Sequence, residues 1–179
     1  MLTIHTADVL APGGESPSVP GGAVLVEGRA IAAVGTYGEL TAAHPTARVR
    51  RWPGTITPGL LNPDGPELLE RSYHPDPRED LGSEPLTGEA LSALAMTDAR
   101  WGASARRGVQ RLLSQGTVAV TGPLRRPAVI DAVHRSGLTI EHGVKPMPLR
   151  PGADATFAIF DATECVATVI RGRLLHRRR

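Results

Sequence analysis

The two ends of the chain share one pattern, in which a short turn containing glycine separates two apolar runs. Near the N-terminus, Gly28 lies between the runs 23–26 and 30–34. Near the C-terminus, Gly172 follows the run 166–170 and precedes another apolar run. Short connections with glycine are typical of β-hairpins, because glycine adopts positive φ without a Cβ clash. The sequence therefore predicts a β-hairpin near each end of the chain.

The middle of the chain has a helical period instead. Between residues 89 and 115, apolar side chains recur every three or four positions. Thr87 is suited to the N-cap of this helix and Gly116 to its C′ position. Gly102 and Gly108 weaken the central part, so the region is predicted to form either one long helix or two consecutive helices.

A second α/β element follows the helical region. The run 117–121 has the composition of a compact strand. Pro127 is suited to the first position of a helix over 127–136, which Gly137 would close. A strand is expected at 138–141. The order of β-rich, α/β and β-rich segments predicts a mixed α+β fold.

A polar, proline-rich loop at about residues 63–86 precedes these helices. No hydrophobic period runs through it, so we expect a long loop or partial disorder. Charges of both signs alternate there: Glu67, Glu70, Arg71, Asp76, Arg78, Glu79 and Asp80. We interpret them as solvated ion pairs, with a docking surface as the alternative. Arg106, Arg107 and Arg111 are expected on the solvent-exposed face of the long helix.

Cysteine content and charge exclude several classes of protein. Cys165 is the single cysteine, which excludes an internal disulfide framework and a zinc site built from several thiolates. Its place beside a strand predicts a buried side chain rather than a nucleophile. With 20 basic and 18 acidic residues the net charge is +2, so nucleic acid is not an expected partner. The basic tail, Arg177 to Arg179, leaves a polyanion-binding protein as an alternative.

The sequence also shows no pattern typical of a membrane-spanning segment or a signal peptide. No stretch approaches the roughly 20 consecutive apolar residues that span a bilayer. Residues 1–8 contain neither a basic region nor a continuous apolar region of the kind found in signal peptides. These observations predict a cytoplasmic protein that has no membrane partner.

Four segments of the sequence resemble segments of the amidohydrolase superfamily, in particular of its imidazolonepropionase-like and cytosine-deaminase-like branches. They lie at 24–35, 57–62, 149–161 and 167–175. The resemblance implies a small composite β-sandwich built from both chain ends, into which a metal-bearing (β/α)₈ barrel is inserted. On this basis we expect residues 1–57 and 149–179 to form the sandwich, and 58–148 to form a truncated α/β remnant of the TIM-type barrel.

The middle segment departs from the family at its metal site. In the family, two histidines at positions i and i+2 follow the phrase that begins here at Pro58, and both bind one divalent metal. The corresponding positions here are Asp64 and Pro66, and proline has no ligand atom. Asp64, His74 and His142 remain as weak candidates for metal ligands, although no spacing links them.

Length gives a separate argument. A closed (β/α)₈ barrel needs about 200 residues or more, whereas about 90 residues separate Pro58 from Arg150. We therefore expect a shortened, non-catalytic amidohydrolase-like protein, a pseudoenzyme that acts by binding a partner or ligand. The sequence assigns no catalytic residue, no binding residue and no cofactor.

An enzyme is the alternative. It would be a metal-dependent hydrolase of non-peptide carbon–nitrogen bonds, acting as a cyclic amide or amidine hydrolase or a deaminase. A divalent metal such as zinc would need replacement ligands, for example from another chain. In either case a truncated barrel leaves strand edges uncovered, so we expect a homo-oligomer or a complex with a related protein.

Overall fold

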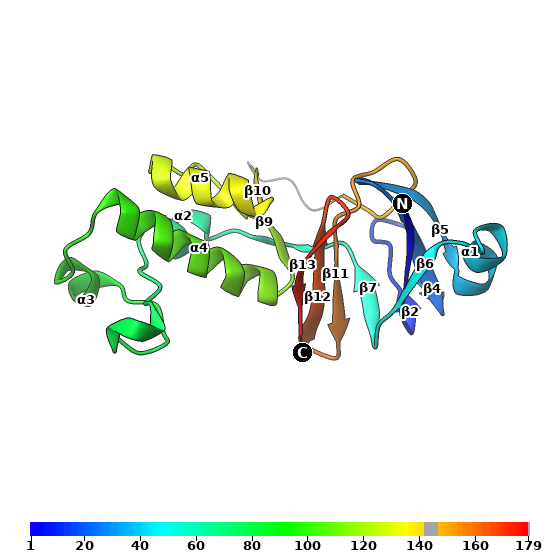
Figure 1. Cartoon of the computed structure of the whole chain (residues 1–179), viewed down its shortest axis with the longest axis horizontal. Coiled ribbons are helices and arrows are strands. Elements are labelled where there is room, and N and C mark those ends of the chain that lie inside the picture. Colours follow the sequence, from blue (N-terminus) through cyan, green and yellow to red (C-terminus); the bar gives the residue numbers. More distant parts are fainter. Residues whose placement is uncertain (142–146, 179) are drawn as a thin grey trace. The chain divides into compact units, whose positions relative to one another are not determined.

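The computed structural model describes residues 1–141 and 147–178 of the chain (Figure 1). These residues divide into two compact units. The first unit contains residues 1–60, 113–118 and 147–178, and the second contains residues 61–112 and 119–141. Helices and strands occur in both, which confirms the predicted mixed α+β class. No helix in the described ranges is both long enough and apolar enough to cross a membrane.

Two sheets make up most of the first unit. The six-stranded sheet has the order β13-β12-β11-β7-β2-β3, and the four-stranded sheet has the order β5-β4-β1-β6. The strands of the larger sheet are β2 (Val9–Leu10), β3 (Val19–Pro20), β7 (Thr55–Thr57), β11 (Phe157–Asp161), β12 (Glu164–Ile170) and β13 (Arg173–Arg177). Those of the smaller sheet are β1 (Leu2–Thr6), β4 (Gly22–Glu27), β5 (Ala30–Thr36) and β6 (Arg48–Arg51).

Both predicted hairpins are present. Strands β4 and β5 pair antiparallel around Gly28, which has a φ of +60°. Strands β12 and β13 pair antiparallel around Gly172, with a φ of +73°. Strands β2 and β7 pair in parallel, as do β1 and β6, and the other described strands of these sheets pair antiparallel.

The main core lies between these two sheets and contains side chains from both ends of the chain. From the smaller sheet it takes Val24, Val26 and Ile31, each at most 3% exposed. The other sheet contributes buried residues of β2, β7, β11 and β12: Leu10, Ile56, Phe157, Ile159, Ala167 and Val169. Two sheets that bury facing apolar side chains form a β-sandwich. This sandwich therefore joins the N-terminal and C-terminal segments.

A second, smaller core covers the outer face of the four-stranded sheet. Helix α1 (Tyr37–Ala43) packs Leu40 against Ile4 and Leu25. The helix begins with a capping box, in which Thr36 and Glu39 satisfy each other's main-chain N–H groups.

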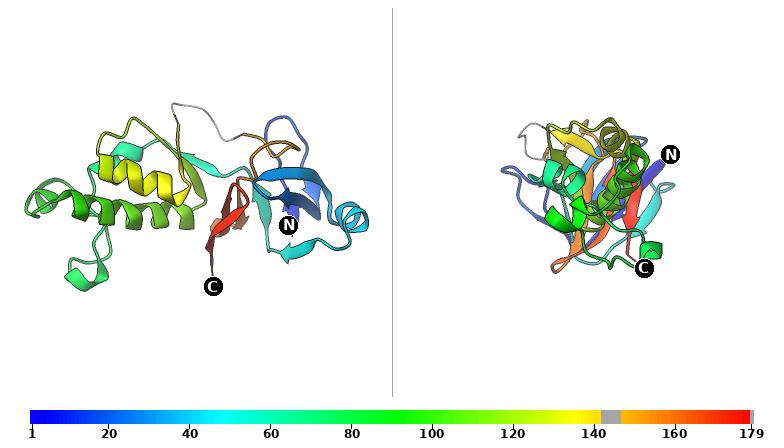
Figure 2. Two further views of the ribbon diagram at one scale, coloured as in Figure 1. Left: turned by 45° about the horizontal axis from the view of Figure 1, so that its top comes forward. Right: turned by 90° about the vertical axis from the view of Figure 1, so that its left-hand side faces the viewer.

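The second unit holds most of the helices. They are α2 (Gly65–Glu70), the 3₁₀ turn η1 (Pro77–Glu79), α3 (Gly88–Ser92), α4 (Asp98–Ser114) and α5 (Pro127–Ser136). A three-stranded sheet has the order β10-β9-β8, from β8 (Leu60–Asn62), β9 (Thr117–Thr121) and β10 (Thr139–Glu141). Strands β9 and β10 pair in parallel. Helices α4 and α5 lie side by side (Figure 1 and Figure 2).

The helical region 89–115 forms two helices rather than one. Neither Gly102 nor Gly108 marks the division, because both lie inside α4. The chain instead leaves α3 after Ser92 and starts again at Thr97. The Thr97 hydroxyl accepts a hydrogen bond from the Arg100 N–H at 3.2 Å, as an N-cap residue does.

The proline-rich segment is more regular than predicted. It contains α2 and η1, and its Tyr73 and His74 are 1% and 6% exposed. The expectation of a loop without regular structure is therefore wrong for these residues. The pattern missed them because α2 has only six residues, too few to show a helical period.

Candidate functional site

The carboxyl ends of β8, β9 and β10 are the first place to look for a site, because parallel sheets bind ligands at that edge. Asp64 lies just after β8 and is exposed. It occupies the N-cap position of α2 but forms no side-chain capping hydrogen bond there. Its main-chain N–H donates to Asn62 Oδ1 at 2.9 Å. Pro66 stands in the first turn of the helix.

Helix α2 begins directly against the carboxyl end of β9. A Cβ atom on Gly65 would collide with the Thr121 carbonyl oxygen and would lie 3.1 Å from the Val120 Cβ. Glycine is therefore required for this close approach of two main chains. As a consequence, the first turn of α2 lies directly against the end of β9.

His74 is held by the protein itself. Its Nε2 lies 2.8 Å from the Leu68 carbonyl oxygen and donates to it. Its main-chain N–H donates to Ser104 Oγ at 2.9 Å. Burial is the largest cause that lowers the pKa of the imidazole, so the ring is neutral near pH 7. Since Nε2 carries a hydrogen toward Leu68, this nitrogen offers no lone pair to a metal.

The third candidate, His142, lies outside the described residues. Within residues 1–141 and 147–178, no three His, Cys, Asp or Glu side chains form a group that could hold a metal ion. Asp64 and His74 therefore join no such group. The described part of the chain offers neither of them the donor set that a divalent cation requires.

A charged network holds the segment after His74 on helix α4. The Tyr73 phenol donates to Glu79 Oε2 at 2.6 Å, and Arg100 Nη2 donates to Glu79 Oε1 at 2.8 Å. Arg107 Nε donates to the His74 carbonyl oxygen at 2.8 Å. The hydrogen bond from Tyr73 is the largest cause that lowers the pKa of Glu79, to about 2. The network fixes a loop on a helix, which is a structural role.

This network corrects two expectations. Glu79 is not a freely solvated member of the charge run, because its side chain is only 28% exposed. Arg107 does not lie on a freely solvated face either, since it contacts Tyr73, His74 and Asp76. One pattern in the sequence does indicate that this face of the helix has polar contacts. Polar residues recur at a helical spacing along one stripe of α4: Arg100, Ser104, Arg107 and Arg111.

An open hollow of about 500 Å³ lies near the start of α2. It is lined by Pro66, Glu70, Arg71, Pro123, Arg125 and Arg126. The Glu70 carboxylate accepts the main-chain N–H groups of Arg125 and Arg126 at 2.7 Å and 2.6 Å. These two donors could otherwise receive an anion, and Glu70 already satisfies them.

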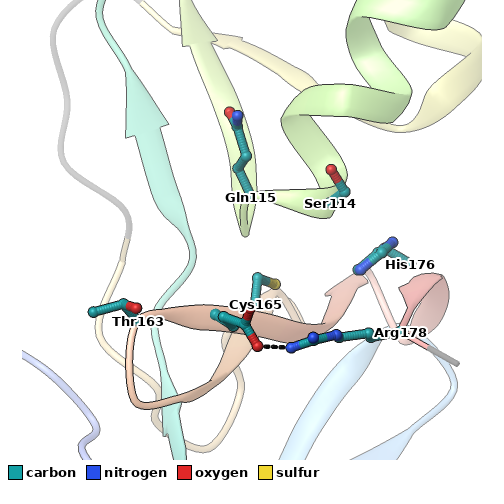
Figure 3. Close-up of a pocket in the computed structure, with 7 residues that line it drawn as sticks. Ser114, Gln115, Thr163, Cys165, His176 and Arg178 are labelled. Atoms are coloured by element: carbon teal, nitrogen blue, oxygen red, sulfur yellow. Dashed lines mark ion pairs between the residues drawn. The ribbon is translucent and has the colours of Figure 1, made fainter.

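A second hollow, of about 460 Å³, belongs to the sandwich unit (Figure 3). Its lining comprises Ser114, Gln115, Thr163, Glu164, Cys165, His176 and Arg178. Arg178 forms an ion pair with Glu164, drawn as the dashed line in Figure 3. The Cys165 Sγ lies 3.4 Å from the Ala167 carbonyl oxygen and 3.4 Å from Thr168 Oγ1.

The thiol of Cys165 is not activated. The residue is buried, as the sequence predicted, and burial is the largest cause that raises the pKa of the thiol. A nucleophilic cysteine needs a lowered pKa, because the thiolate is the reactive form. Cys165 is therefore suited to packing rather than to covalent catalysis.

Comparisons with known proteins agree with the resemblance seen in the sequence. The family described as the imidazolonepropionase-like composite domain of bacteria matches residues 22–47. These residues contain β4, β5 and α1, and so include the N-terminal hairpin. No curated protein sequence matches the chain.

Two solved structures share the fold. Ochratoxinase from A. niger is 21% identical, with a TM-score of 0.51, over 82% of this chain and 30% of that protein. An adenosine deaminase from Xanthomonas campestris, solved with bound zinc, is 15% identical, with a TM-score of 0.52, over 76% of this chain and 32% of that protein. The chain spans about a third of the length of each. Together these matches confirm the predicted resemblance to the amidohydrolase superfamily.

Proposed function

We propose that this chain is a non-catalytic amidohydrolase-like protein that acts by binding, and that β8, β9 and β10 with their helices are a shortened remnant of the barrel. The observation that carries the proposal is the position of α2. Its first turn lies against the end of β9, with no room for a Cβ at Gly65. In a barrel enzyme, the carboxyl ends of the strands are where the active site is built.

The state of the candidate ligands supports the same proposal. Asp64 is exposed at a helix start, and Nε2 of His74 is committed to a main-chain carbonyl. A metal-dependent hydrolase needs several ligands that converge on one ion, and in the described residues neither side chain belongs to such a group. The relatives named above span about three times the length of this chain. Without a metal site, their activities cannot be inferred for this chain.

We further propose that the partner is a second copy of the chain, which contacts it through the free edge of β8. This strand lies at one end of the three-stranded sheet, so one side of its main chain has no neighbouring strand in that sheet. Leu60 on β8 is a large apolar side chain that is 46% exposed. An uncovered edge with an exposed apolar residue favours pairing with another chain.

Metal analysis tests the non-catalytic part of the proposal. The purified protein is incubated with zinc and with manganese, dialysed, and its metal content measured by mass spectrometry. We expect well under one equivalent of either metal. The matched variants are Asp64→Asn and His142→Gln, with the exposed His134→Gln as control. Stoichiometric metal that is lost in the first two variants and kept in the control would overturn the proposal and favour a hydrolase of non-peptide carbon–nitrogen bonds.

Sedimentation velocity tests the partner. We expect the wild-type protein to self-associate at micromolar concentration, and Leu60→Lys to be monomeric because it places a charge on the edge. Val49→Lys is the matched control, since Val49 is also an exposed apolar residue on an edge strand, at 37% exposed. A monomeric wild-type protein, or equal loss of association in both variants, would contradict the proposed edge contact.

A further inference from the structure

Three arginines meet at one edge of the sandwich, and we call Arg48, Arg50 and Arg177 the arginine cluster. Arg48 and Arg50 occupy alternate positions of β6 and therefore lie on the same face of that strand. Arg50 is paired in register with His5 of β1. The His5 ring packs edge-on against Phe157 of the other sheet, with centroids 5.1 Å apart. The cluster residues of β6 thus share the face of the sheet that is directed into the sandwich.

Arg177 reaches the same place from the larger sheet. Its guanidinium carbon lies 5.6 Å from the centre of the Trp52 ring. Trp52 follows β6 and donates from Nε1 to His5 Nδ1 at 3.2 Å. Burial is the largest cause that lowers the pKa of Arg50, and the positive charges of Arg48 and Arg177 lower it further. Residues far apart in the sequence therefore bring three cations together.

Arg50 is the unusual member of the cluster. Its Nε atom is buried and has no hydrogen-bond partner, and no other side-chain nitrogen or oxygen in the described ranges has that status. An unsatisfied buried donor destabilises the folded state, and more so when the group is charged. Native proteins rarely retain such a donor without a ligand, ion or water to satisfy it.

The cluster also lacks a counter-charge. Among residues 1–141 and 147–178, no carboxylate forms an ion pair with any of its three members. Its neighbour His5 is neutral near pH 7, because burial, with help from Arg50 and Arg48, lowers its pKa to about 3. The adjacent Arg51 differs, since it donates to the Tyr37 hydroxyl at 2.6 Å and lies over the Tyr37 ring.

We propose that the arginine cluster binds a dianionic phosphate group, either free or as part of a small phosphorylated molecule. Guanidinium groups bind phosphate oxygens through charge-assisted and often paired hydrogen bonds. A phosphate that binds the other guanidinium nitrogens of Arg50, together with Arg48 and Arg177, would offset the mutual repulsion of three cations. Inward-directed charges on β6 would also discourage pairing at this edge, but that role would require neither a buried Nε nor Arg177 from another strand.

Tryptophan fluorescence tests the proposal directly. Trp101→Phe removes the other tryptophan and leaves Trp52, which contacts the cluster, as the sole reporter. Inorganic phosphate is titrated at constant ionic strength, with acetate in a parallel titration and a simple phosphate monoester in a third. We expect a saturable change with phosphate and little response to acetate. Tighter binding of the monoester than of inorganic phosphate would identify a phosphorylated molecule as the source, and the reverse order would identify free phosphate.

Variants test whether the arginine cluster is responsible for phosphate binding. Arg50→Met should weaken phosphate binding at least about tenfold, the effect of losing one charge-assisted hydrogen bond. Arg51→Met is the matched control on the next residue of the same strand and should leave the affinity within about twofold. If Arg50→Met does not fold, the double variant Arg48→Gln, Arg177→Gln serves instead, because both positions are exposed. An equal response to acetate, an unchanged affinity in these variants, or the absence of any saturable response overturns the proposal.

Discussion

Tyr73 donates a 2.6 Å hydrogen bond to Glu79, and this bond joins the only buried phenol to a carboxylate in the described part of the chain. Arg100 binds the other oxygen of the same carboxylate and lies over the Tyr73 ring, 5.0 Å from its centre. Both oxygens of Glu79 therefore have a donor. This network holds the segment from Tyr73 to Glu79 on α4.

Glu79→Gln is expected to destabilise the protein in a pH-dependent way. Glu79 has a pKa of about 2 in the folded protein, against an ordinary value of 4.5. The stabilising effect of its charge is therefore complete above about pH 4.5 and is lost as the pH falls toward 2. Urea unfolding at several pH values should show a constant difference between wild type and variant above pH 5, and a shrinking difference below it.

Glu84→Gln provides the comparison for that experiment. Glu84 also pairs with an arginine of α4, Arg111, but its side chain is 77% exposed. Exposed ion pairs contribute about 0–1 kcal/mol, so this variant should behave nearly like the wild type. A pH-independent difference in Glu79→Gln would show that the network does not depend on the charge of Glu79.

His5 is expected to make the protein less stable in mild acid. Its pKa is about 3 in the folded state, so the ring stays neutral there while the unfolded chain takes up a proton near pH 6.5. Stability should therefore fall as the pH is lowered from 6.5 toward 3, by on the order of 3 kcal/mol at pH 4. His5→Phe keeps an aromatic ring beside Phe157 and should show a flatter pH dependence in urea unfolding.

The two acid effects are separated by their pH ranges and by their controls. The effect of His5 begins near pH 6.5, whereas that of Glu79 begins near pH 4.5. His134→Gln, at an exposed position of α5, should leave the pH dependence as it is in the wild type. If His5→Phe keeps the full decline between pH 6.5 and pH 4.5, another group is responsible for it.

The sequence was sufficient to predict those strands and helices whose ends are determined by nearby glycine or proline residues. The hairpins at Gly28 and Gly172 follow from a glycine between two apolar runs, and both formed as predicted. The start of α5 at Pro127 follows from the fixed φ of proline, and its end at Gly137 follows from positive φ. In each case, the required information lies within a few residues of the turn.

Contacts between distant residues could not be predicted in this way. The Thr168 hydroxyl donates to the Leu113 carbonyl oxygen at 2.6 Å, and 55 residues separate the two. Nothing beside Tyr73 in the sequence indicates that its side chain is buried. Arg50 lies close to His5 and Arg177 in the fold, and both are far from it in the sequence. Such features depend on the packing of separate segments.

Gly116→Ala is expected to destabilise the protein more than Gly82→Ala. The two glycines have nearly the same φ, +82° and +83°, so both changes introduce similar main-chain strain of about 1–2 kcal/mol. A Cβ on Gly116 would also collide with the Phe160 ring and lie 3.2 Å from the Ala158 Cβ, whereas Gly82 has open space around it. Overpacking adds about 1–3 kcal/mol.

Thermal and urea unfolding of the two variants measure that difference. If main-chain strain were the only effect, both variants would lose the same stability. Any additional loss of stability in Gly116→Ala therefore measures the contact with Phe160. Gly116→Ala combined with Phe160→Leu should recover part of the excess, because the smaller side chain makes room for the new methyl group. Equal destabilisation in both single variants would contradict the close approach of Gly116 to Phe160.

Gly108→Ala and Gly102→Ala, two changes within helix α4, are expected to have opposite effects. Alanine is favoured over glycine in a helix by about 1 kcal/mol. At Gly102 the new Cβ would lie 3.5 Å or more from its neighbours, so this gain should appear as higher stability. At Gly108 it would lie 2.6 Å from His74 Nε2 and 2.9 Å from Leu69 Cδ2. The His74 ring cannot move aside without disturbing its hydrogen bond to the Leu68 carbonyl oxygen, and the Ser104 hydroxyl holds the main chain of His74 in place.

The overpacking at Gly108 should outweigh the gain in helix propensity and leave a net loss of about 1–2 kcal/mol. Hydrogen exchange adds a local readout, because the main-chain N–H of His74 donates to Ser104 and should lose protection in Gly108→Ala only. Stabilisation by both variants would mean that the segment around His74 does not rest on α4 as described. Destabilisation by both variants would mean that an added methyl group destabilises α4 whether or not other residues lie close to it.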